Sequence, residues 1–144
     1  MRLRGRYVID ASVLIEVLAG SRLVRRLVDS IILGKLEALA TRLGLTEALY
    51  VSCRLWGWER ALERAHILLG SGAIKVVEDG GIWEYAANCK CMIPISLGDC
   101  HTLAAAKMYG AKPLFLKPER ELTDNLERIR RWLSMEPEYL ASEI

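Results

Sequence analysis

The strongest constraint on this chain is the alternation of short apolar runs with longer stretches of helical periodicity. Tyr7 to Ile9 is β-branched and aromatic, which is typical of a buried strand, and a helical pattern follows Asp10. Apolar residues then recur at helical spacing from Leu23 to Ile32. Strands that alternate with helices of this length favour a parallel sheet covered by helices, with the carboxyl ends of the strands gathered at one edge.

The remaining elements follow the same pattern. Leu36 to Thr41 fits a strand or a helix, and a short strand there would return the chain to the sheet. Asp79-Gly80-Gly81 is predicted to stop the strand that precedes it. We predict helices over about 45–55, 58–69, 82–89 and 100–109, strands over 73–77 and 113–116, and a last helix whose apolar face carries Leu126, Ile129 and Leu133.

Two local predictions concern the second half of the chain. Met92 to Ser96 reads as extended and apolar, and Pro94 suggests an edge position or the beginning of a strand. Asp124 with Glu127 three residues later resembles a capping box, so the last helix is predicted to begin there. No internal repeat, low-complexity segment or linker interrupts the pattern.

Composition places the chain among soluble globular proteins. Its 144 residues are 52% hydrophobic and 26% charged, which is too apolar for disorder and too interrupted by charge for a membrane span. The length fits one domain over residues 1–144. The apolar run after the basic start is broken by Asp10 and Glu16, so we expect no export signal and a cytoplasmic location. The net charge of +2 permits a nucleic-acid partner without requiring one.

The cysteines do not follow a zinc-binding pattern. Cys89 and Cys91 are close in sequence, but no second pair mirrors them, and His66 and His101 lie at no finger-like spacing. Reduced, mostly buried thiols are therefore expected. Gln is absent and Asn occurs twice beside many Arg and Glu residues, a bias found in proteins of thermophiles. Because such organisms contain intracellular disulfides, pairing of the cysteines stays open.

Asp10, Glu47 and Asp99 are the candidate functional residues. Each is predicted to lie where the chain leaves the sheet or begins a helix beside it, with Glu47 in the first turn of the helix from about residue 45. Carboxylates that converge raise one another's pKa unless a cation neutralises them. Their hard oxygen ligands select Mg²⁺ or Mn²⁺, which can activate water and stabilise charge on a phosphate. The pattern therefore favours hydrolysis of a phosphodiester.

Each of these residues also has an ordinary structural explanation. Asp99 could be the N-cap of its helix, Glu47 could complement a helix dipole, and Asp10 could accept hydrogen bonds from the following turn. Ser12 is more often a cap than a catalytic group, and His101 is more often a partly buried helix residue than a ligand or base. Spacing alone does not decide between the two interpretations.

Three segments of the chain resemble the PIN domains, a family of nucleases. The segment 7–15, YVIDASVLI, resembles the opening strand of that family and its metal-binding Asp. Thr46-Glu47-Ala48 resembles the acidic residue on the helix after the second strand, and the segment 95–104, ISLGDCHTLA, resembles the third acidic segment. The order of the segments agrees with the family over residues 7–122. The resemblance implies a three-layer α/β/α fold with a short central parallel sheet.

The resemblance also implies a function. PIN proteins bind Mg²⁺ or Mn²⁺ and often cut RNA as the toxin of a VapBC-type toxin–antitoxin pair. The resemblance implies that Asp10 and Asp99 are catalytic and ligate metal, and that Glu47 ligates metal directly or through water. Ser12 is implied to hold these ligands in position. The implied partners are an RNA substrate, a small antitoxin protein that covers the acids, and a second copy of the chain in a homodimer.

One position departs from the family pattern. Many PIN proteins place a fourth acid, usually Asp, just after the last strand, whereas residues 116–121 of this chain read LKPERE. Glu119 is the aligned choice for a fourth metal ligand and Glu121 is the alternative. Both reach further than Asp, and two solvated loop glutamates are an equally simple interpretation. Without a fourth acid, a second metal would bind weakly and the reaction would be slow.

A metal-dependent endoribonuclease is the first hypothesis for the function. A PIN-like scaffold that binds RNA or a protein partner without cutting is the second, because the fourth Asp is missing. Phosphatase chemistry through Asp10 as a nucleophile ranks last, since the second acid expected two positions later is Ser12.

Overall fold

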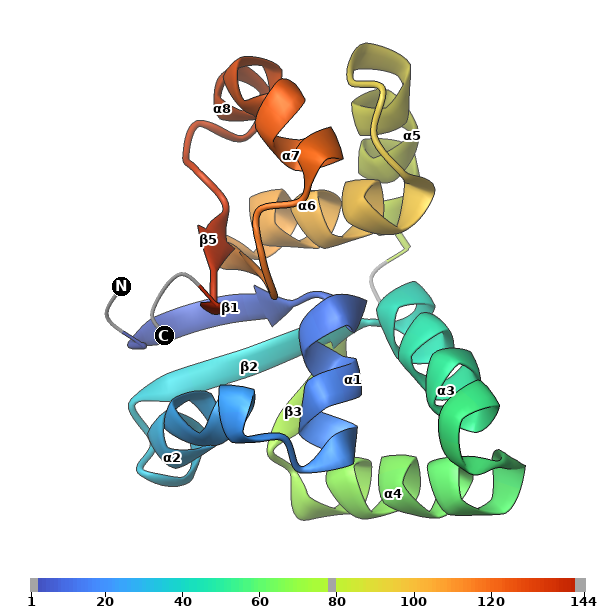
Figure 1. The fold of residues 1–144 in the computed structure, drawn as a ribbon. Helices are drawn as coiled ribbons and strands as arrows, with labels where there is room; N and C mark the ends of the chain where they lie inside the picture. The colour runs from blue at the N-terminus through green and yellow to red at the C-terminus, as the bar shows by residue number, and fades with distance from the viewer. Residues whose placement is uncertain (1–2, 78–79, 142–144) are drawn as a thin grey trace.

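A parallel sheet with helices on both faces forms the centre of the structure (Figure 1). This computed structural model describes residues 3–77 and 80–141, so the predicted stop at Asp79 lies outside the described residues. The strands are β1 (Gly5–Ile9), β2 (Leu36–Thr41), β3 (Ile74–Val77), β4 (Lys112–Phe115) and β5 (Glu138–Tyr139). The helices are α1 (Ala11–Ala19), the 3-10 turn η1 (Arg22–Val24), α2 (Arg25–Ile32), α3 (Arg42–Trp56), α4 (Trp58–Ser71), α5 (Ile82–Met92), α6 (Leu97–Tyr109), α7 (Arg120–Asp124) and α8 (Leu126–Leu133).

The strand order β3-β2-β1-β4-β5, with every pair parallel, confirms the predicted α/β/α fold class. From β1 the chain winds outward to β3 and then returns to place β4 on the other side of β1. The carboxyl ends of β1 and β4 therefore mark the point where the winding reverses, which is where open α/β sheets bind ligands. The backbone N–H of Asp10 donates to the carbonyl of Leu114 over 2.9 Å and holds the two strand ends together.

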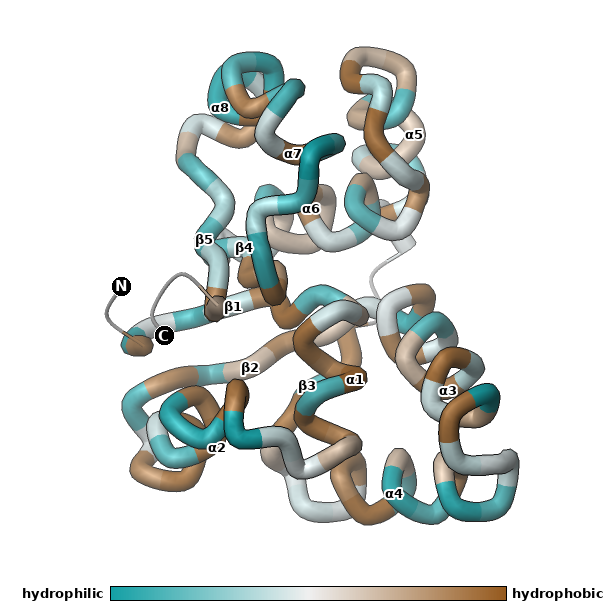
Figure 2. Tube along the Cα trace, viewed as in Figure 1, coloured by the Kyte–Doolittle hydropathy of each residue, from teal (hydrophilic) through white to brown (hydrophobic). Residues whose placement is uncertain are grey.

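Alternating side chains of the strands build two separate cores. Val8 and Leu39 pack with α5, α6 and α8, whereas Tyr7 and Ile9 pack with the face covered by α1 to α4. Hydrophilic residues lie along outer helices such as α4 and α8 (Figure 2). In the part of the chain that the structure describes, no helix is both long and apolar enough to cross a membrane.

Two helix starts differ from the predictions and change the surroundings of two acids. Helix α3 begins at Arg42, because the Oγ1 of Thr41 caps it by accepting from the N–H of Gly44 over 2.9 Å. Glu47 therefore lies in the second turn, and the prediction of a first-turn position was wrong. Ser96 caps α6, so Asp99 lies in the first turn of that helix and is not its N-cap.

Two predictions in the C-terminal half were also wrong, and one strand there was not predicted. Residues 92–96 form no strand: Met92 ends α5, and the buried Ile93 and Ile95 anchor an irregular connection in the core between α5 and α6. The predicted capping box fails because a separate short helix, α7, ends at Asp124, whose carboxylate pairs with Arg120 at 3.5 Å. Strand β5 was not predicted, because its two residues are too few to show an alternating apolar pattern.

Candidate active site

Asp10 lies between β1 and α1 and is only 7% exposed. Its Oδ2 accepts from the backbone N–H of Ser12 at 3.0 Å and from the Ser12 hydroxyl at 2.7 Å. Its Oδ1 accepts from the Thr102 hydroxyl at 2.7 Å. The Ser12 Oγ in turn accepts from the backbone N–H of Leu116 at 3.1 Å, just beyond β4. These donors fix the carboxylate in one orientation and tie it to α6 and to the end of β4.

Asp99 brings a second carboxyl to the same edge from the first turn of α6. Burial raises the pKa of Asp99 to about 7, and the nearby carboxylate of Asp10 is the next largest cause. A hydrogen bond with Ser96 lowers this pKa, while Glu121 and, to a smaller extent, Glu119 raise it. The described geometry therefore places Asp99 within the electrostatic field of Asp10 and of the two glutamates after β4.

Glu47 approaches from α3 and lies against the backbone of Gly98. A β-carbon built at Gly98 would lie 2.3 Å from the Oε1 of Glu47, so a larger residue there would force the end of the Glu47 side chain to move from this position. Burial raises the pKa of Glu47, as does Asp10, whereas His101 lowers it. The Nδ1 of His101 lies 2.9 Å from the carbonyl oxygen of Leu97. Because that oxygen can only accept, Nδ1 is the protonated nitrogen in this hydrogen bond.

The fold thus brings Asp10, Glu47 and Asp99 to one edge of the sheet, with Glu119 and Glu121 exposed beside them. Within residues 3–77 and 80–141, however, no three His, Cys, Asp or Glu side chains are close enough to hold a metal ion together. The donors themselves fit Mg²⁺ or Mn²⁺, because all of them are hard carboxylate oxygens and Asp10 is already oriented.

Comparisons with known proteins identify the family of the chain. The family model for the PIN domain matches residues 7–117. The chain belongs to the PIN domain family. PIN domains are generally nucleases, so this is a member of a nuclease family. No curated protein matches the sequence.

Two solved structures show the same PIN fold at low identity. A chain from a toxin–antitoxin complex of Klebsiella pneumoniae is 12% identical with a TM-score of 0.61, and the match covers 81% of this chain and 89% of that one. A protein from Pyrobaculum aerophilum is 21% identical with a TM-score of 0.55, and the match covers 90% of this chain and 98% of that one. At these identities the likeness concerns the fold.

Sequence reasoning missed two residues of this PIN domain that shape the site. Thr102 is buried and donates to Asp10, and Gly98 provides the space for Glu47. Thr102 follows Asp99 by three residues on α6, a spacing that puts both side chains on one helix face, so the sequence contained a signal for it. The requirement for glycine at residue 98 depends on how α3 packs against α6, which no local pattern encodes.

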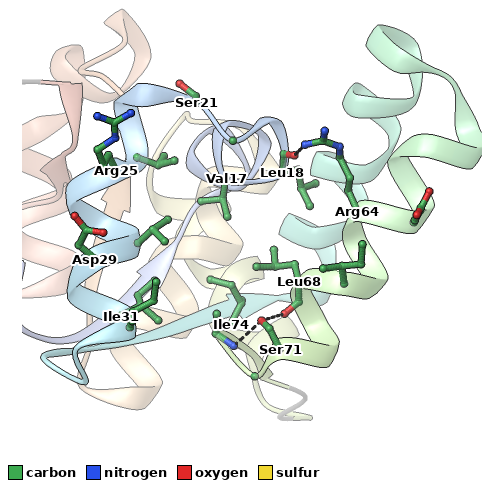
Figure 3. A pocket seen from close by; sticks show the side chains of 18 of the residues that line it. Val17, Leu18, Ser21, Arg25, Asp29, Ile31, Arg64, Leu68, Ser71 and Ile74 are labelled. Atoms are coloured by element: carbon green, nitrogen blue, oxygen red, sulfur yellow. Dashed lines mark hydrogen bonds between the residues drawn. The ribbon is translucent and has the colours of Figure 1, made fainter.

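A large groove lies away from the acids, at the opposite end of α1 (Figure 3). It encloses about 1020 Å³ between α1, α2, α4 and the start of β3. Arg64 crosses its rim and donates to the carbonyl of Leu18 over 2.8 Å. The groove of this PIN domain is mainly apolar, with side chains that include Val17, Leu18, Val28, Ile67, Leu68 and Ile74.

Proposed function

We propose that this PIN domain is a metal-dependent endoribonuclease that hydrolyses RNA phosphodiester bonds at the carboxyl edge of its sheet. The observation that carries the proposal is the Asp10 carboxylate, which is buried, oriented by hydroxyl and amide donors, and electrostatically coupled to Glu47 and Asp99. A carboxylate with a purely structural role would need only the groups that donate hydrogen bonds to it. The gathering of two further acids around it costs free energy and is typical of a cation site.

The proposed roles follow from the surroundings of each acid. Asp10 and Asp99 hold Mg²⁺ or Mn²⁺, and Glu47 contacts the ion directly or through water. A bound ion of this kind supplies an activated water and stabilises charge on the phosphate. Asp99 must lose its proton before it can serve as a ligand, because its pKa is raised to about 7. Glu119 is the proposed fourth carboxylate, and Glu121 is the alternative that influences Asp99 more strongly.

Ser12 and Thr102 act in this proposal by holding Asp10. The Ser12 hydroxyl and amide occupy Oδ2, and the Thr102 hydroxyl occupies one side of Oδ1. Side chains that orient metal ligands in this way affect metal affinity or activity about 10- to 100-fold when they are removed. Oδ1 is therefore the oxygen of Asp10 that we expect to face the ion.

Replacement of Asp10 or Asp99 by Asn tests the proposal. We expect cleavage of a single-stranded RNA with Mn²⁺ to fall at least about 100-fold, and the heat of Mn²⁺ binding in a calorimetric titration to disappear. Asp124→Asn is the matched control, because Asp124 is exposed and pairs only with Arg120 among the ion pairs described. Undiminished cleavage by a cleanly purified Asp10→Asn protein would rule the proposal out.

A scaffold that binds RNA or a protein partner without cutting is the second candidate function. It is favoured by the lack of a ready-made three-ligand cluster in the described residues and by the exposure of both glutamates after β4. The same calorimetric titration separates the two candidates. A scaffold would give no Mn²⁺ heat that depends on Asp10, while its RNA or partner binding would survive Asp10→Asn.

We also infer that the protein is the toxin of a cytoplasmic toxin–antitoxin pair and forms a homodimer. A chain of similar fold belongs to a toxin–antitoxin complex. The groove at the far end of α1 supports a partner that presents an apolar surface, since its lining is mainly apolar and carries charges of both signs, Arg25, Arg60 and Arg64 with Asp29 and Glu63. An amphipathic helix whose polar edges carry both acidic and basic residues complements such a groove. The product of a short neighbouring gene should therefore copurify with the chain, which by itself should elute as a dimer in size-exclusion chromatography.

A further inference from the structure

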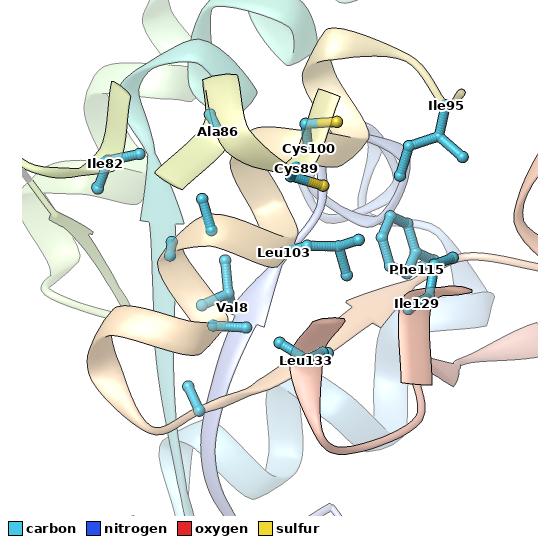
Figure 4. Close-up of a cluster of buried hydrophobic side chains, with 14 of the residues drawn as sticks. Val8, Ile82, Ala86, Cys89, Ile95, Cys100, Leu103, Phe115, Ile129 and Leu133 are labelled. Carbon is cyan, nitrogen blue, oxygen red and sulfur yellow. The ribbon is translucent and has the colours of Figure 1, made fainter. Parts of the chain in front are cut away.

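Two cysteine side chains lie near each other in the core between α5 and α6. Cys89 and Cys100 are both 0% exposed and belong to the same buried cluster. Figure 4 shows their sulfur atoms near each other within that cluster. Both are free thiols in this structure. Two buried thiols that lie near each other on different helices can form a disulfide when their β-carbons come to about 4 Å apart.

The other two cysteines differ in their surroundings. Cys91 is exposed on α5, although it is only two residues from Cys89, because side chains two apart on a helix do not share a face. Cys53 lies on α3 and is partly exposed. The fold therefore selects Cys89 and Cys100, and not the closest pair in the sequence.

We propose that oxidation joins Cys89 and Cys100 in a disulfide that cross-links α5 to the beginning of α6. The two S–H bonds break, one S–S bond forms, and two electrons and two protons pass to a small-molecule disulfide, which is reduced to two thiols. Because both sulfurs are buried, exchange takes place while the α5–α6 corner is forming or locally open. Once the corner is packed, the same burial shields the bond from reductants.

Other contacts already stabilise the corner between α5 and α6, and the proposed disulfide adds to them. The connection of residues 93–96 carries the buried Ile93 and Ile95, and the Lys90 ammonium donates to the carbonyl of Ile95 over 2.6 Å. A disulfide across this short connection restricts the unfolded chain and stabilises the fold. The composition also agrees, since a chain that lacks Gln and has two Asn resembles heat-adapted proteins, in which intracellular disulfides occur.

Counting of free thiols tests the proposal on the full-length chain. The protein is refolded in a buffer of glutathione and glutathione disulfide, then unfolded, alkylated and digested for mass spectrometry. We expect alkylation of Cys53 and Cys91 alone, and a linked peptide pair that joins Cys89 to Cys100 with a mass lower by two hydrogen atoms. Four alkylated cysteines, or a linkage that includes Cys91, would overturn the proposal.

Thermal unfolding gives a second, independent test in a chain with both other cysteines replaced, Cys53→Ser with Cys91→Ser. The oxidised form should melt about 5 °C or more above the reduced form, which is prepared by unfolding and refolding the protein in a reductant because the folded bond is shielded. Further replacement of Cys100 by Ala should remove this difference between the two forms. Equal melting temperatures for the oxidised and reduced forms of the first variant would contradict the stabilising role. Neither test uses RNA or metal, so a failure here leaves the nuclease proposal unaffected.

Discussion

The two ends of helix α1 are built on opposite principles. At its amino end, Asp10 is buried and held by hydrogen bonds from Ser12 and Thr102. At its carboxyl end, Val17 and Leu18 line a groove of about 1020 Å³ that is mainly apolar. Fixed charge needs polar contacts from several elements, whereas recognition of a partner needs apolar surface that the fold leaves uncovered. We therefore expect the proposed chemistry and the proposed recognition of a partner to be separable in this PIN domain.

Outside the proposed metal-ligating carboxylates themselves, the largest effect is expected from Gly98→Ala. The new β-carbon would lie 2.3 Å from the Oε1 of Glu47, so Glu47 must move, and RNA cleavage with Mn²⁺ should fall about 100-fold. Gly70→Ala is the matched control, because it lies in α4 with no atom within 4 Å of the added carbon. That control should retain activity and gain about 0.5 to 1 kcal/mol of stability. Full activity in Gly98→Ala would mean that the position of Glu47 is unimportant.

A charge in the groove should affect only recognition. Ile67 is 64% exposed and lines the groove, so Ile67→Asp should weaken binding of the copurifying partner about 30-fold, as expected for a central interface residue. Leu55→Asp serves as the control, because Leu55 is 63% exposed on α3 and outside the groove lining. Isothermal titration calorimetry measures the affinity for the partner, and an RNA assay measures the rate of cleavage. Equal loss of both activities in Ile67→Asp would contradict the separation of the two ends.

A smaller effect is expected from Thr102→Val. Valine keeps the shape of threonine but removes the hydroxyl that donates to the Oδ1 of Asp10 over 2.7 Å. Mn²⁺ affinity measured by calorimetry should fall about 10-fold, because the carboxylate is no longer oriented. Thr102→Ser keeps the hydroxyl and should retain most of the affinity. The argument for a positioning role fails if valine and serine behave alike.

The smallest expected effect is on stability and depends on pH. The folded pKa of Asp99 is about 7, against an ordinary value of 3.8, so the folded state binds the proton more tightly. Stability from this group is therefore fully present below pH 3.8 and is lost as the pH rises from there through about 7. Without metal, Asp99→Asn should be more stable than the parent chain by about 1 kcal/mol at pH 8 and no more stable at pH 4. Urea unfolding at both pH values measures this, and a pH-independent difference would argue against a raised pKa.

The sequence predicts the strand ends better than it predicts their surroundings. Asp10 could be placed because a β-branched run followed by Asp marks the end of a buried strand. Glu47 could be placed on the right helix but not in the right turn. The N-cap at Thr41 starts this helix earlier than the apolar pattern indicates. Side chains from different helices meet through packing, so the contact of Glu47 with Gly98 is visible only in three dimensions.

The groove could not be predicted for a related reason. Apolar residues on α2 and α4 have the same helical spacing whether a neighbouring helix covers them or leaves them open. Ile67 and Ile32 follow the pattern of core residues, yet they are 64% and 74% exposed. Periodicity reports which face of a helix is apolar, and the arrangement of the other helices decides whether that face is buried.

The length of α1 sets a minimum size for any groove-bound inhibitor. The helix spans residues 11–19, which at 1.5 Å of rise per residue is about 13 Å. A peptide anchored among Val17 and Leu18 therefore cannot reach Asp10 by its anchor alone. It needs a tail of roughly four extended residues to bridge that distance, so shortening the tail should leave a ligand that still binds tightly but no longer blocks catalysis.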